Sequence, residues 1–423
     1  MNLLAFTILC FLAVSVTAAD QPADSPTPPL PATGKEDPDL ASFDELMRSF
    51  MTEHHVPGGA LAVTRGGRLV YARGFGFADA QKKEPVLATS LFRIASLSKP
   101  LTAVGVLQLA EQGKVKLDEP MLWQLPPDTR PANLGDPRLE QLTLRQLLRH
   151  TGGWDIGKIG FDPMFRSIEI ARAEKTAPPA QAEDIIRFML RRKLDFDPGA
   201  GGAYSNFGYC VLGRIIEQAA QQSYQEYVRE HVLAPLGIRE MRLGHTLPEG
   251  RAPGEVEYFD RKGQKGAAVV GEPLGRQVPL PYGTFYLEAM DAHGGWLAPA
   301  VDLVRFVAAF DDAEHCKILK PESARAMWER PPGDPGFEKD GTPKAAYYAC
   351  GWMVRPIGKA GKVNAWHTGM LPGTSTLLVH RHDGLDWAVL FNSDGDDKCS
   401  SLSGAIDPLV HRAADAVRKW PEE

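Results

Sequence analysis

The stretch that decides the fold of this chain is Phe92-Arg93-Ile94-Ala95-Ser96-Leu97-Ser98-Lys99. From Ser96 the sequence predicts a helix that ends at Gly113, because apolar residues recur at helical spacing: Leu101, Val104, Leu107, Leu109 and Ala110. Ser96 and Lys99 stand three positions apart at the start of this helix, so both side chains project from one face and can touch. The stretch therefore predicts a serine and a lysine in contact at a helix N-terminus.

This pair has the chemistry of a nucleophile and its base. A serine hydroxyl is a weak nucleophile at neutral pH and needs a base beside it. A lysine can act as that base where desolvation or nearby cations lower its pKa. The helix N-terminus favours negative charge on the serine oxygen, and Pro100 is tolerated in a first turn. Taken alone, Ser-x-x-Lys is a weak motif, and Ser98 could instead serve only as the capping residue.

A second motif follows a glycine-rich loop. Residues 198–203 lead into Tyr204-Ser205-Asn206, and a helix is predicted directly afterwards, at Phe207–Glu217. Tyr204 can relay a proton, and Asn206 can hydrogen-bond a substrate carbonyl or the lysine. The alternative is that Asn206 caps the helix, and both roles are compatible.

The tripeptide His-Thr-Gly occurs twice, beginning at His150 and at His367. The first copy follows a short predicted helix, and Gly152-Gly153 stands where a C-cap glycine belongs, so His150 is predicted to be structural. The second copy ends a predicted strand, Val363–Trp366, whose edge can offer backbone groups to an extended substrate. His367 would add a donor or a positive charge there. The predicted site therefore includes the second copy, His367, Thr368 and Gly369.

Strand-like runs lie at both ends of the chain, and helices and loops fill the middle. Arg65-Gly66-Gly67 predicts a hairpin near the N-terminus, and four more β-rich runs lie near the C-terminus: Tyr347–Val354, Val363–Trp366, Ser375–His380 and Asp386–Phe391. We therefore predict an α/β (α+β) domain over residues 42–420. Its antiparallel sheet, from residues 42–114 and 290–420, is covered by helices, and residues 115–289 form a mostly helical part.

Composition limits the class of protein. The 423 residues are 43% hydrophobic and 24% charged, with a net charge of −6, which is typical of a soluble globular protein. The sequence contains no basic stripe, which argues against a nucleic-acid partner. It shows no internal repeats, which excludes solenoids and propellers.

The N-terminus predicts export to the periplasm or the medium. Leu3–Val16 is an apolar run too short to cross a bilayer comfortably, and small residues follow it, so residues 1–19 are predicted to be a signal peptide. No Lys or Arg precedes the run, which leaves an uncleaved anchor as the alternative. No stable membrane span is expected after cleavage. Residues 20–41, rich in proline, are predicted to form a mobile leader.

Four cysteines remain after the predicted cleavage, and their spacing fits no metal-ligand pattern. Cys210 lies among apolar residues and is predicted to be part of the core. Cys316 and Cys399 lie in polar loops and are the candidates for a disulfide.

Together, Ser96-x-x-Lys99, Tyr204-x-Asn206 and His367-Thr368-Gly369, in this order and spacing, resemble the serine β-lactamase and penicillin-binding protein superfamily. The resemblance is to the branch of class C β-lactamases, D-alanyl-D-alanine carboxypeptidases, D-aminopeptidases and related esterases. It covers nearly all of residues 42–419 and includes further landmarks, at residues 147–153, 234–237, 294–296 and 302–306.

The resemblance implies a β-lactamase/transpeptidase-like fold and a two-step acyl transfer. Ser96 would attack a carbonyl, Lys99 and Tyr204 would handle its proton, and the backbone N–H groups of Ser96 and Met370 would bind the oxyanion. It also implies no metal and no cofactor. Four further histidines are then predicted to lie at the surface or in turns and not to be ligands: His54, His55, His380 and His382.

One departure from the family pattern bears on the substrate. β-Lactamases of this type usually carry Lys-Thr-Gly where this chain has His-Thr-Gly, and a histidine there is familiar from the carboxypeptidase and esterase relatives. The expected substrate is thus a small ester or amide, of the esterase or D-amino-acid peptidase/carboxypeptidase type. A true β-lactamase and a non-catalytic scaffold of the same fold remain as alternatives. The segments Ile156–Ala182 and His245–Tyr286 are predicted to shape the pocket.

Overall fold

The computed structural model describes residues 30–79, 81–260, 262–358, 361–396, 399 and 401–421. The predicted signal peptide, residues 1–19, and most of the predicted leader lie outside these residues. Among the described residues, no helix is both long and apolar enough to span a bilayer.

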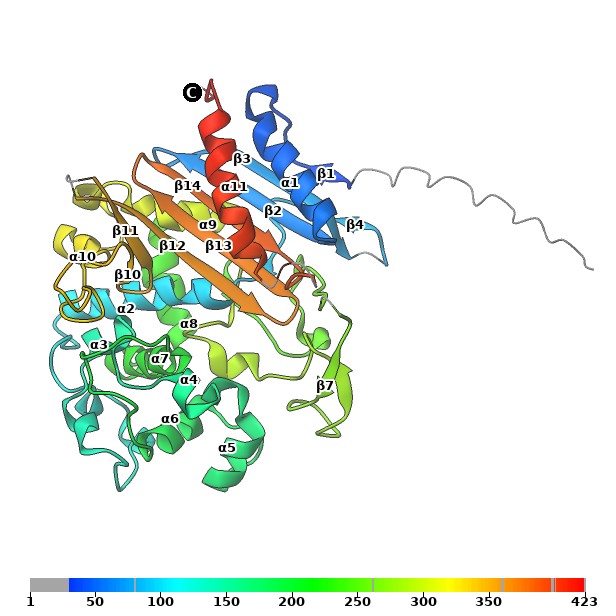
Figure 1. Ribbon diagram of the computed structural model, residues 1–423. Helices are drawn as coiled ribbons and strands as arrows, with labels where there is room; N and C mark the ends of the chain where they lie inside the picture. Colours follow the sequence, from blue (N-terminus) through cyan, green and yellow to red (C-terminus); the bar gives the residue numbers. More distant parts are fainter. Residues whose placement is uncertain are drawn as a thin grey trace, which may run out of the picture. The chain divides into compact units, whose positions relative to one another are not determined.

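A nine-stranded antiparallel sheet forms the centre of the body from Pro31 onward, in the order β1-β3-β2-β14-β13-β12-β11-β10, with β4 beside β3. The strands are β1 Ala32–Thr33, β2 Gly58–Arg65, β3 Arg68–Asp79, β4 Glu84–Pro85, β10 Tyr347–Tyr348, β11 Met353–Ile357, β12 Lys362–Leu371, β13 Thr374–Arg381 and β14 Leu385–Phe391. The N-terminal hairpin joins the C-terminal strands where Leu61 pairs with Val389. One antiparallel sheet from both ends of the chain is therefore confirmed (Figure 1).

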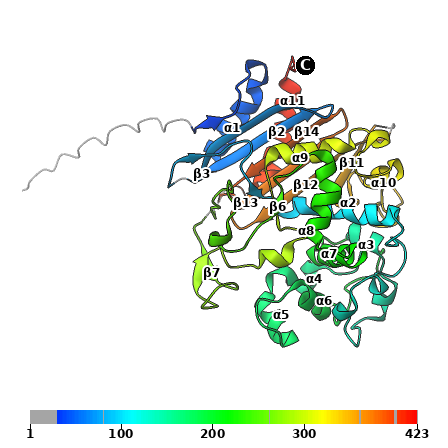
Figure 2. The ribbon, with the colours of Figure 1, turned by 180° about the vertical axis from the view of Figure 1, so that it is seen from behind.

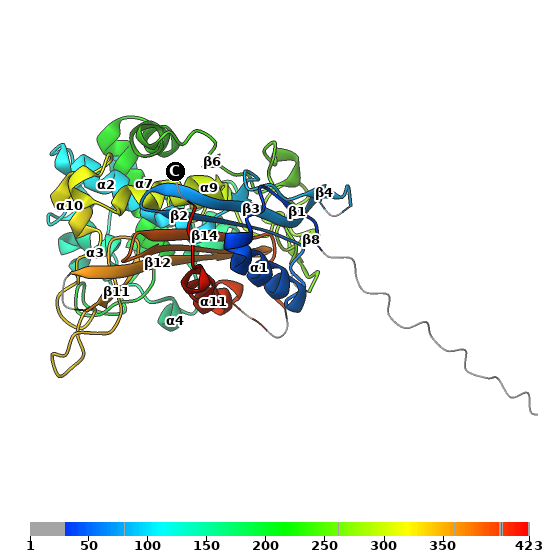
Figure 3. The ribbon, with the colours of Figure 1, turned by 90° about the horizontal axis from the view of Figure 1, so that it is seen from above.

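Helices cover both faces of the sheet, which explains why β13 and β14 are buried along their whole length. Helices α1, Ala41–Glu53, and α11, Leu402–Ala416, pack together on one face. Helix α9, Ala300–Val307, packs on the other face against β2 and β14. The view along the sheet shows the resulting layers (Figure 3), and Figure 2 shows the face that carries α9.

The helical part is built around α2, Ser98–Glu111, which contacts α7, Asn206–Ala220. The other helices are α3 Leu144–Leu148, α4 Ile156–Ile159, α5 Ser167–Glu174, α6 Ala182–Leu190, α8 Tyr224–Tyr227 and α10 Pro321–Ala326. Short strands complete it: β5 Phe92–Arg93, β6 Arg242–Leu243, β7 Lys265–Ala267, β8 Gln277–Pro279 and β9 Trp296–Ala298.

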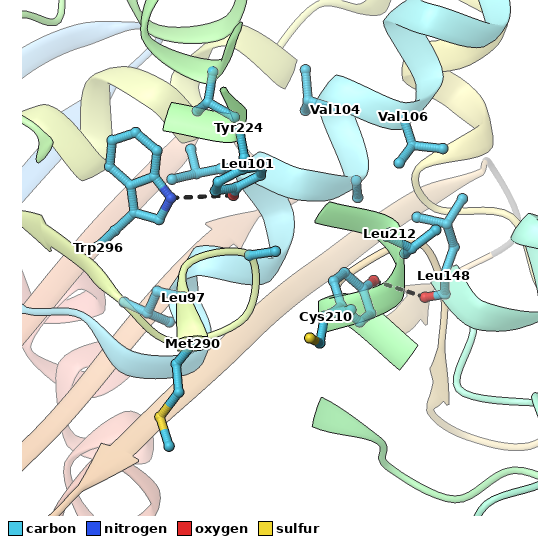
Figure 4. Packing of buried hydrophobic residues seen from close by; sticks show 14 of the residues in the cluster. Leu97, Leu101, Val104, Val106, Leu148, Cys210, Leu212, Tyr224, Met290 and Trp296 are labelled. Atoms are coloured by element: carbon cyan, nitrogen blue, oxygen red, sulfur yellow. Dashed lines mark hydrogen bonds between the residues drawn. The ribbon is translucent and has the colours of Figure 1, made fainter. Parts of the chain in front are cut away.

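Several polar side chains packed against α2 are hydrogen-bonded to one another. The indole Nε1 of Trp296 donates to the Tyr224 hydroxyl at 3.1 Å (Figure 4), and the same hydroxyl lies 2.7 Å from Thr102 Oγ1. These residues are buried, so each bond avoids the cost of an unpaired polar group. The packing fixes the axis of α2 and hence the position of its N-terminus.

The prediction of a mobile leader over residues 20–41 is wrong in part, because residues 31–41 belong to the fold. Ala32 pairs with Phe75 at the edge of the sheet, and the Thr33 hydroxyl donates to Val86 O at 2.6 Å. Pro38 starts a short 3-10 helix, where a missing N–H costs nothing, and Leu40 is buried. This proline-rich stretch is ordered by its pairing with the edge of the sheet and by the burial of Leu40.

The prediction of one strand over Tyr347–Val354 is also wrong, because this stretch contains β10 and the start of β11. Gly351, with φ +80°, reverses the chain so that β10 folds back on β11 and Tyr348 pairs with Met353. A Cβ at Gly351 would meet Lys99 O at 3.2 Å, so glycine allows the reversal to sit against the start of α2.

The predicted disulfide between Cys316 and Cys399 is wrong, since both are free thiols, as are Cys210 and Cys350. Cys316 follows α9 on one face of the sheet, whereas Cys399 precedes α11 on the other. Cys210 is fully buried in α7, which confirms it as part of the core.

His380 is not a surface histidine as predicted, because β13 places it inside the fold. Its Nδ1 lies 2.8 Å from Asp386 Oδ1 and 3.5 Å from Asp311 Oδ1, and its ring stacks on Trp328. Burial opposes protonation, but the two carboxylates outweigh it and raise the pKa of His380. The three side chains bring ligand-type atoms within 4.8 Å of one another, and their contacts are those of a buried ion pair.

Candidate active site

Ser96 lies in a strained turn at the N-terminus of α2. The preceding Ala95 has φ +49°, a left-handed conformation that costs about 1–2 kcal/mol for a residue with a Cβ. The Ser98 hydroxyl donates to Ala95 O at 2.7 Å, which ties the turn together. Ser98 is fully buried and makes no side-chain cap, so Ser96 is the serine that faces the cavity.

Lys99 is fully buried directly behind Ser96. Its Nζ lies 3.1 Å from Ser96 Oγ, and it donates to Asn206 Oδ1 at 2.7 Å and to His293 O at 3.0 Å. Burial lowers the pKa of Lys99 well below its usual range, and the charge of Asp162 opposes this only in part. A neutral amine with its hydrogens held by those two carbonyl oxygens presents its lone pair to Ser96.

Tyr204 approaches Ser96 from the other side and donates its hydroxyl to Ser96 Oγ at 2.7 Å. Burial raises the pKa of Tyr204, so the side chain stays a phenol at neutral pH. The Lys99 amine lies over the Tyr204 ring, 4.7 Å from its centroid. Lys99 therefore suits the role of base, and Tyr204 suits the role of proton donor.

Asn206 is held in one orientation by Asp162. The Asn206 Nδ2 donates to Asp162 Oδ2 at 2.6 Å, and because a carboxylate only accepts, the Oδ1 must face Lys99. The prediction that Asn206 caps α7 is wrong: Asn206 is its first residue, and Ser205 Oγ accepts from Gly208 N–H as the cap. Asp162 belongs to no motif, although it lies in the segment predicted to shape the pocket.

His367 sits in β12 and is 3% exposed. Its Nδ1 lies 2.7 Å from Thr368 O, and its Nε2 is hydrogen-bonded to the Tyr348 hydroxyl. Burial and the neighbouring Lys99 lower the pKa of His367 to about 3. His367 is therefore neutral near pH 7, and the prediction of a positive charge there is wrong. Tyr348 was not singled out from the sequence, because nothing there predicts the chain reversal at Gly351.

The cavity in front of Ser96 has a volume of about 360 Å³ and is lined by Ser96, Tyr204, Asn206, Tyr348, Met353, Trp366, His367, Thr368 and Met370. Strand β11 pairs with β12 only as far as Trp366, so among the described residues no strand covers that edge of β12 from His367 to Leu371. Gly369 allows β12 to lie close to the backbone before Ser96, because a Cβ at this position would meet Ile94 O at 2.4 Å. The open edge matches the expectation of backbone groups offered to substrate.

His150 forms the back wall of the same site. Its φ is +56°, directly after the C-cap Arg149 of α3, so the predicted C-cap role of Gly152-Gly153 is wrong. His150 Nδ1 accepts from Ser205 N–H at 3.1 Å, and its ring packs 4.6 Å from Tyr204 and 4.4 Å from Tyr348. These contacts support Tyr204 from behind without reaching Ser96.

With this geometry established, the class of protein follows from comparison with known families. Residues 43–403 match the family model described as Beta-lactamase. The chain therefore belongs to the β-lactamase family, within the serine β-lactamase and penicillin-binding protein superfamily.

Individual relatives have diverse names. Penicillin-binding protein 4* of Bacillus subtilis (strain 168) is 26% identical over 347 residues, which cover 82% of this chain and 70% of that protein. Esterase EstB of Burkholderia gladioli is 33% identical over 252 residues, 57% of this chain and 58% of the esterase, so less than two thirds of that relative is matched. The solved D-amino acid amidase of Ochrobactrum anthropi SV3 with D-phenylalanine is 25% identical, with a TM-score of 0.64 over 90% of this chain and 99% of the amidase.

Proposed function

We propose that this protein is a serine hydrolase that works through an acyl-enzyme on a small ester or amide, of the esterase or D-amino-acid peptidase type. The observation that carries the proposal is the position of Ser96 Oγ, 3.1 Å from Lys99 Nζ and 2.7 Å from the Tyr204 hydroxyl. An activated serine between a buried amine and a phenol is an arrangement for nucleophilic catalysis.

In the acylation step, Ser96 Oγ attacks the substrate carbonyl carbon while its proton passes to Lys99 Nζ. The oxyanion that forms is bound by the backbone N–H groups of Ser96 and Met370. When the intermediate collapses, the carbonyl–leaving-group bond breaks and the leaving group takes the Tyr204 proton, which the Lys99 ammonium restores. Water then attacks the acyl-Ser96 ester by the same route and releases the acid.

The names of the relatives support a hydrolase that accepts esters or amides, since they include an esterase and a D-amino acid amidase. The proposal also includes the export signal at residues 1–19 and a catalytic domain over residues 42–420, extended at its start by the ordered residues from Ala32.

A substrate panel tests the proposal: a p-nitrophenyl ester, a chromogenic cephalosporin and a D-Ala-D-Ala peptide, each with the wild type, Ser96→Ala and Ser98→Ala. We expect ester or peptide turnover that falls by about 10³-fold or more in Ser96→Ala, as for loss of a nucleophile. Ser98→Ala is the matched control and should keep most of the rate. Dominant cephalosporin hydrolysis would instead identify a true β-lactamase, and a folded protein without turnover would identify a scaffold.

A further inference from the structure

The position that carries a cation in relatives with Lys-Thr-Gly carries an uncharged ring in this chain. A carbonyl oxygen cannot donate, so the hydrogen between His367 and Thr368 O belongs to Nδ1. Burial and Lys99 keep the ring neutral by lowering the pKa of His367, so Nε2 is the acceptor and takes the Tyr348 O–H. Both nitrogens of His367 are thus occupied by the protein itself, and neither carries a charge to offer.

The Tyr348 hydroxyl is held in place by the rings around it. Its ring meets His150 edge-on at 4.4 Å and 81°, and Tyr204 at 5.9 Å and 62°. His150 is itself fixed by the N–H of Ser205. Because His150 is buried and Tyr204 is held by its bond to Ser96, Tyr348 has little freedom to turn away from His367.

The remaining surface of the cavity is also uncharged. Among the described residues, the lining side chains are hydroxyl, amide, aromatic and thioether groups together with the neutral His367. Lys99 lies behind Ser96, and its Nζ donates hydrogen bonds to Asn206 Oδ1 and His293 O. The guanidinium of Arg355 packs over the Trp366 ring at 5.1 Å but does not line the cavity. A carboxylate placed here would lose water without gaining a cation, which is unfavourable.

Resting on the proposed function, we propose that the site takes acyl compounds without a carboxylate beside the scissile bond, and that the Tyr348–His367 pair sets this preference. The substrate class is then an uncharged ester or amide. Compounds with a free carboxylate at the leaving group, such as D-Ala-D-Ala peptides and cephalosporins, would be disfavoured by charge.

A pair of thioesters that differ only in charge tests this: benzoylglycyl mercaptoacetate and benzoylglycyl mercaptoacetamide, each followed by release of the thiol. In the wild type we expect kcat/KM for the carboxamide to exceed that for the carboxylate by about 10-fold or more. Because the ratio is taken within one preparation, partial loss of folded protein does not alter it.

Variants assign the preference to the pair. His367→Lys supplies a cation, so it should lower the ratio by about 10-fold or more. Tyr348→Phe removes the O–H bonded to Nε2, but His367 stays buried beside Lys99, so the ratio should fall by less. Tyr347→Phe is the matched control: its hydroxyl donates to Trp328 O outside the cavity, so the ratio should not change.

The outcomes separate the two proposals. Ser96-dependent release of thiol with equal or greater preference for the carboxylate would overturn the inference and leave the proposed function intact. A ratio unaffected by both Tyr348→Phe and His367→Lys would remove the pair from the explanation. If the folded wild type releases thiol from neither compound, the proposed function itself fails.

Discussion

The two His-Thr-Gly segments share a tripeptide but differ in backbone, and this difference separates their roles. His150 adopts a left-handed turn at the end of α3, whereas His367 lies within β12. Both rings are buried, and both contact Tyr348: His150 through its ring, His367 through a hydrogen bond to the hydroxyl. The same side chain can therefore support a site from behind or line it, according to the element that carries it.

The comparison also shows that the two segments are less independent than the sequence suggests. His150 contacts Tyr204 and Tyr348, and Tyr348 contacts His367, so the aromatic rings form one continuous wall. Substitutions in either segment should disturb the same wall. Those at His367 should mainly lower kcat/KM, and those at His150 should mainly lower the stability of the fold.

Within the wall formed by the two segments, the largest effect is expected for His367→Ala, with kcat/KM falling about 10²-fold. The change removes the acceptor of the Tyr348 hydroxyl and opens the wall of the cavity in front of Ser96. Because His367 is buried, the melting temperature should fall as well. Steady-state kinetics and thermal melting measure both, with His382→Ala in a surface turn as the control. Unchanged kcat/KM in a folded variant would remove His367 from the site.

A smaller effect on rate is expected for Asp162→Asn, a change in the same helical part as His150. The Asp162 charge raises the pKa of Lys99 against the larger, opposite effect of burial. Removing it lowers that pKa further, and activity requires neutral Lys99. The acid limb of the pH–rate profile should therefore move to lower pH, and kcat/KM should fall about 10-fold as the Asn206 amide loses its fixed orientation.

Asp155→Asn is the matched control, because Asp155 caps α4 and asparagine caps equally well. Its pH profile should equal that of the wild type. An unmoved acid limb in Asp162→Asn would show that Asp162 acts only as a structural residue.

His150→Ala should mainly reduce stability, with a change in kcat/KM of less than about threefold. The substitution leaves the Ser205 N–H without its acceptor and opens a cavity, so we expect a loss of about 2–4 kcal/mol. Denaturant unfolding measures this loss, and His150→Asn, which tolerates a left-handed backbone, should lose less. Loss of activity in a fully folded His150→Ala protein would reverse the assignment of the two histidines.

The smallest effect is a shared acid sensitivity. Burial lowers the pKa values of His150, His293 and His367 below the ordinary value of about 6.5. The unfolded chain then binds protons that the folded chain refuses, so stability is full above pH 6.5 and declines as the pH falls below it. His380, whose pKa is raised, opposes this in part. His411 also has a lowered pKa, and His315 a raised one. Unfolding free energies that stay flat between pH 8 and about 5.5 would contradict the expected net loss of stability.

Sequence reasoning reached the elements that local pattern defines. The helix after Ser96, the sheet from both termini and the contact of Lys99 with Ser96 follow from periodicity and motif spacing. The approach of Tyr204 to Ser96 was implied by the family resemblance. Asp162 and Tyr348 were missed because each reaches the site through a reversal or loop that only tertiary packing determines. The strand at Ala32 was missed because two residues show no pattern, and only the edge of β3 orders them.

The central claim is that Ser96 is the nucleophile and Lys99 its base, and mapping a fluorophosphonate adduct against pH tests it most directly. Peptide mapping of the labelled protein should find the phosphonyl group on Ser96. The labelling rate should rise with pH through the lowered pKa of Lys99 and then level off. A label on Ser98 or Ser205, or a labelling rate on Ser96 that does not change with pH, would contradict the account.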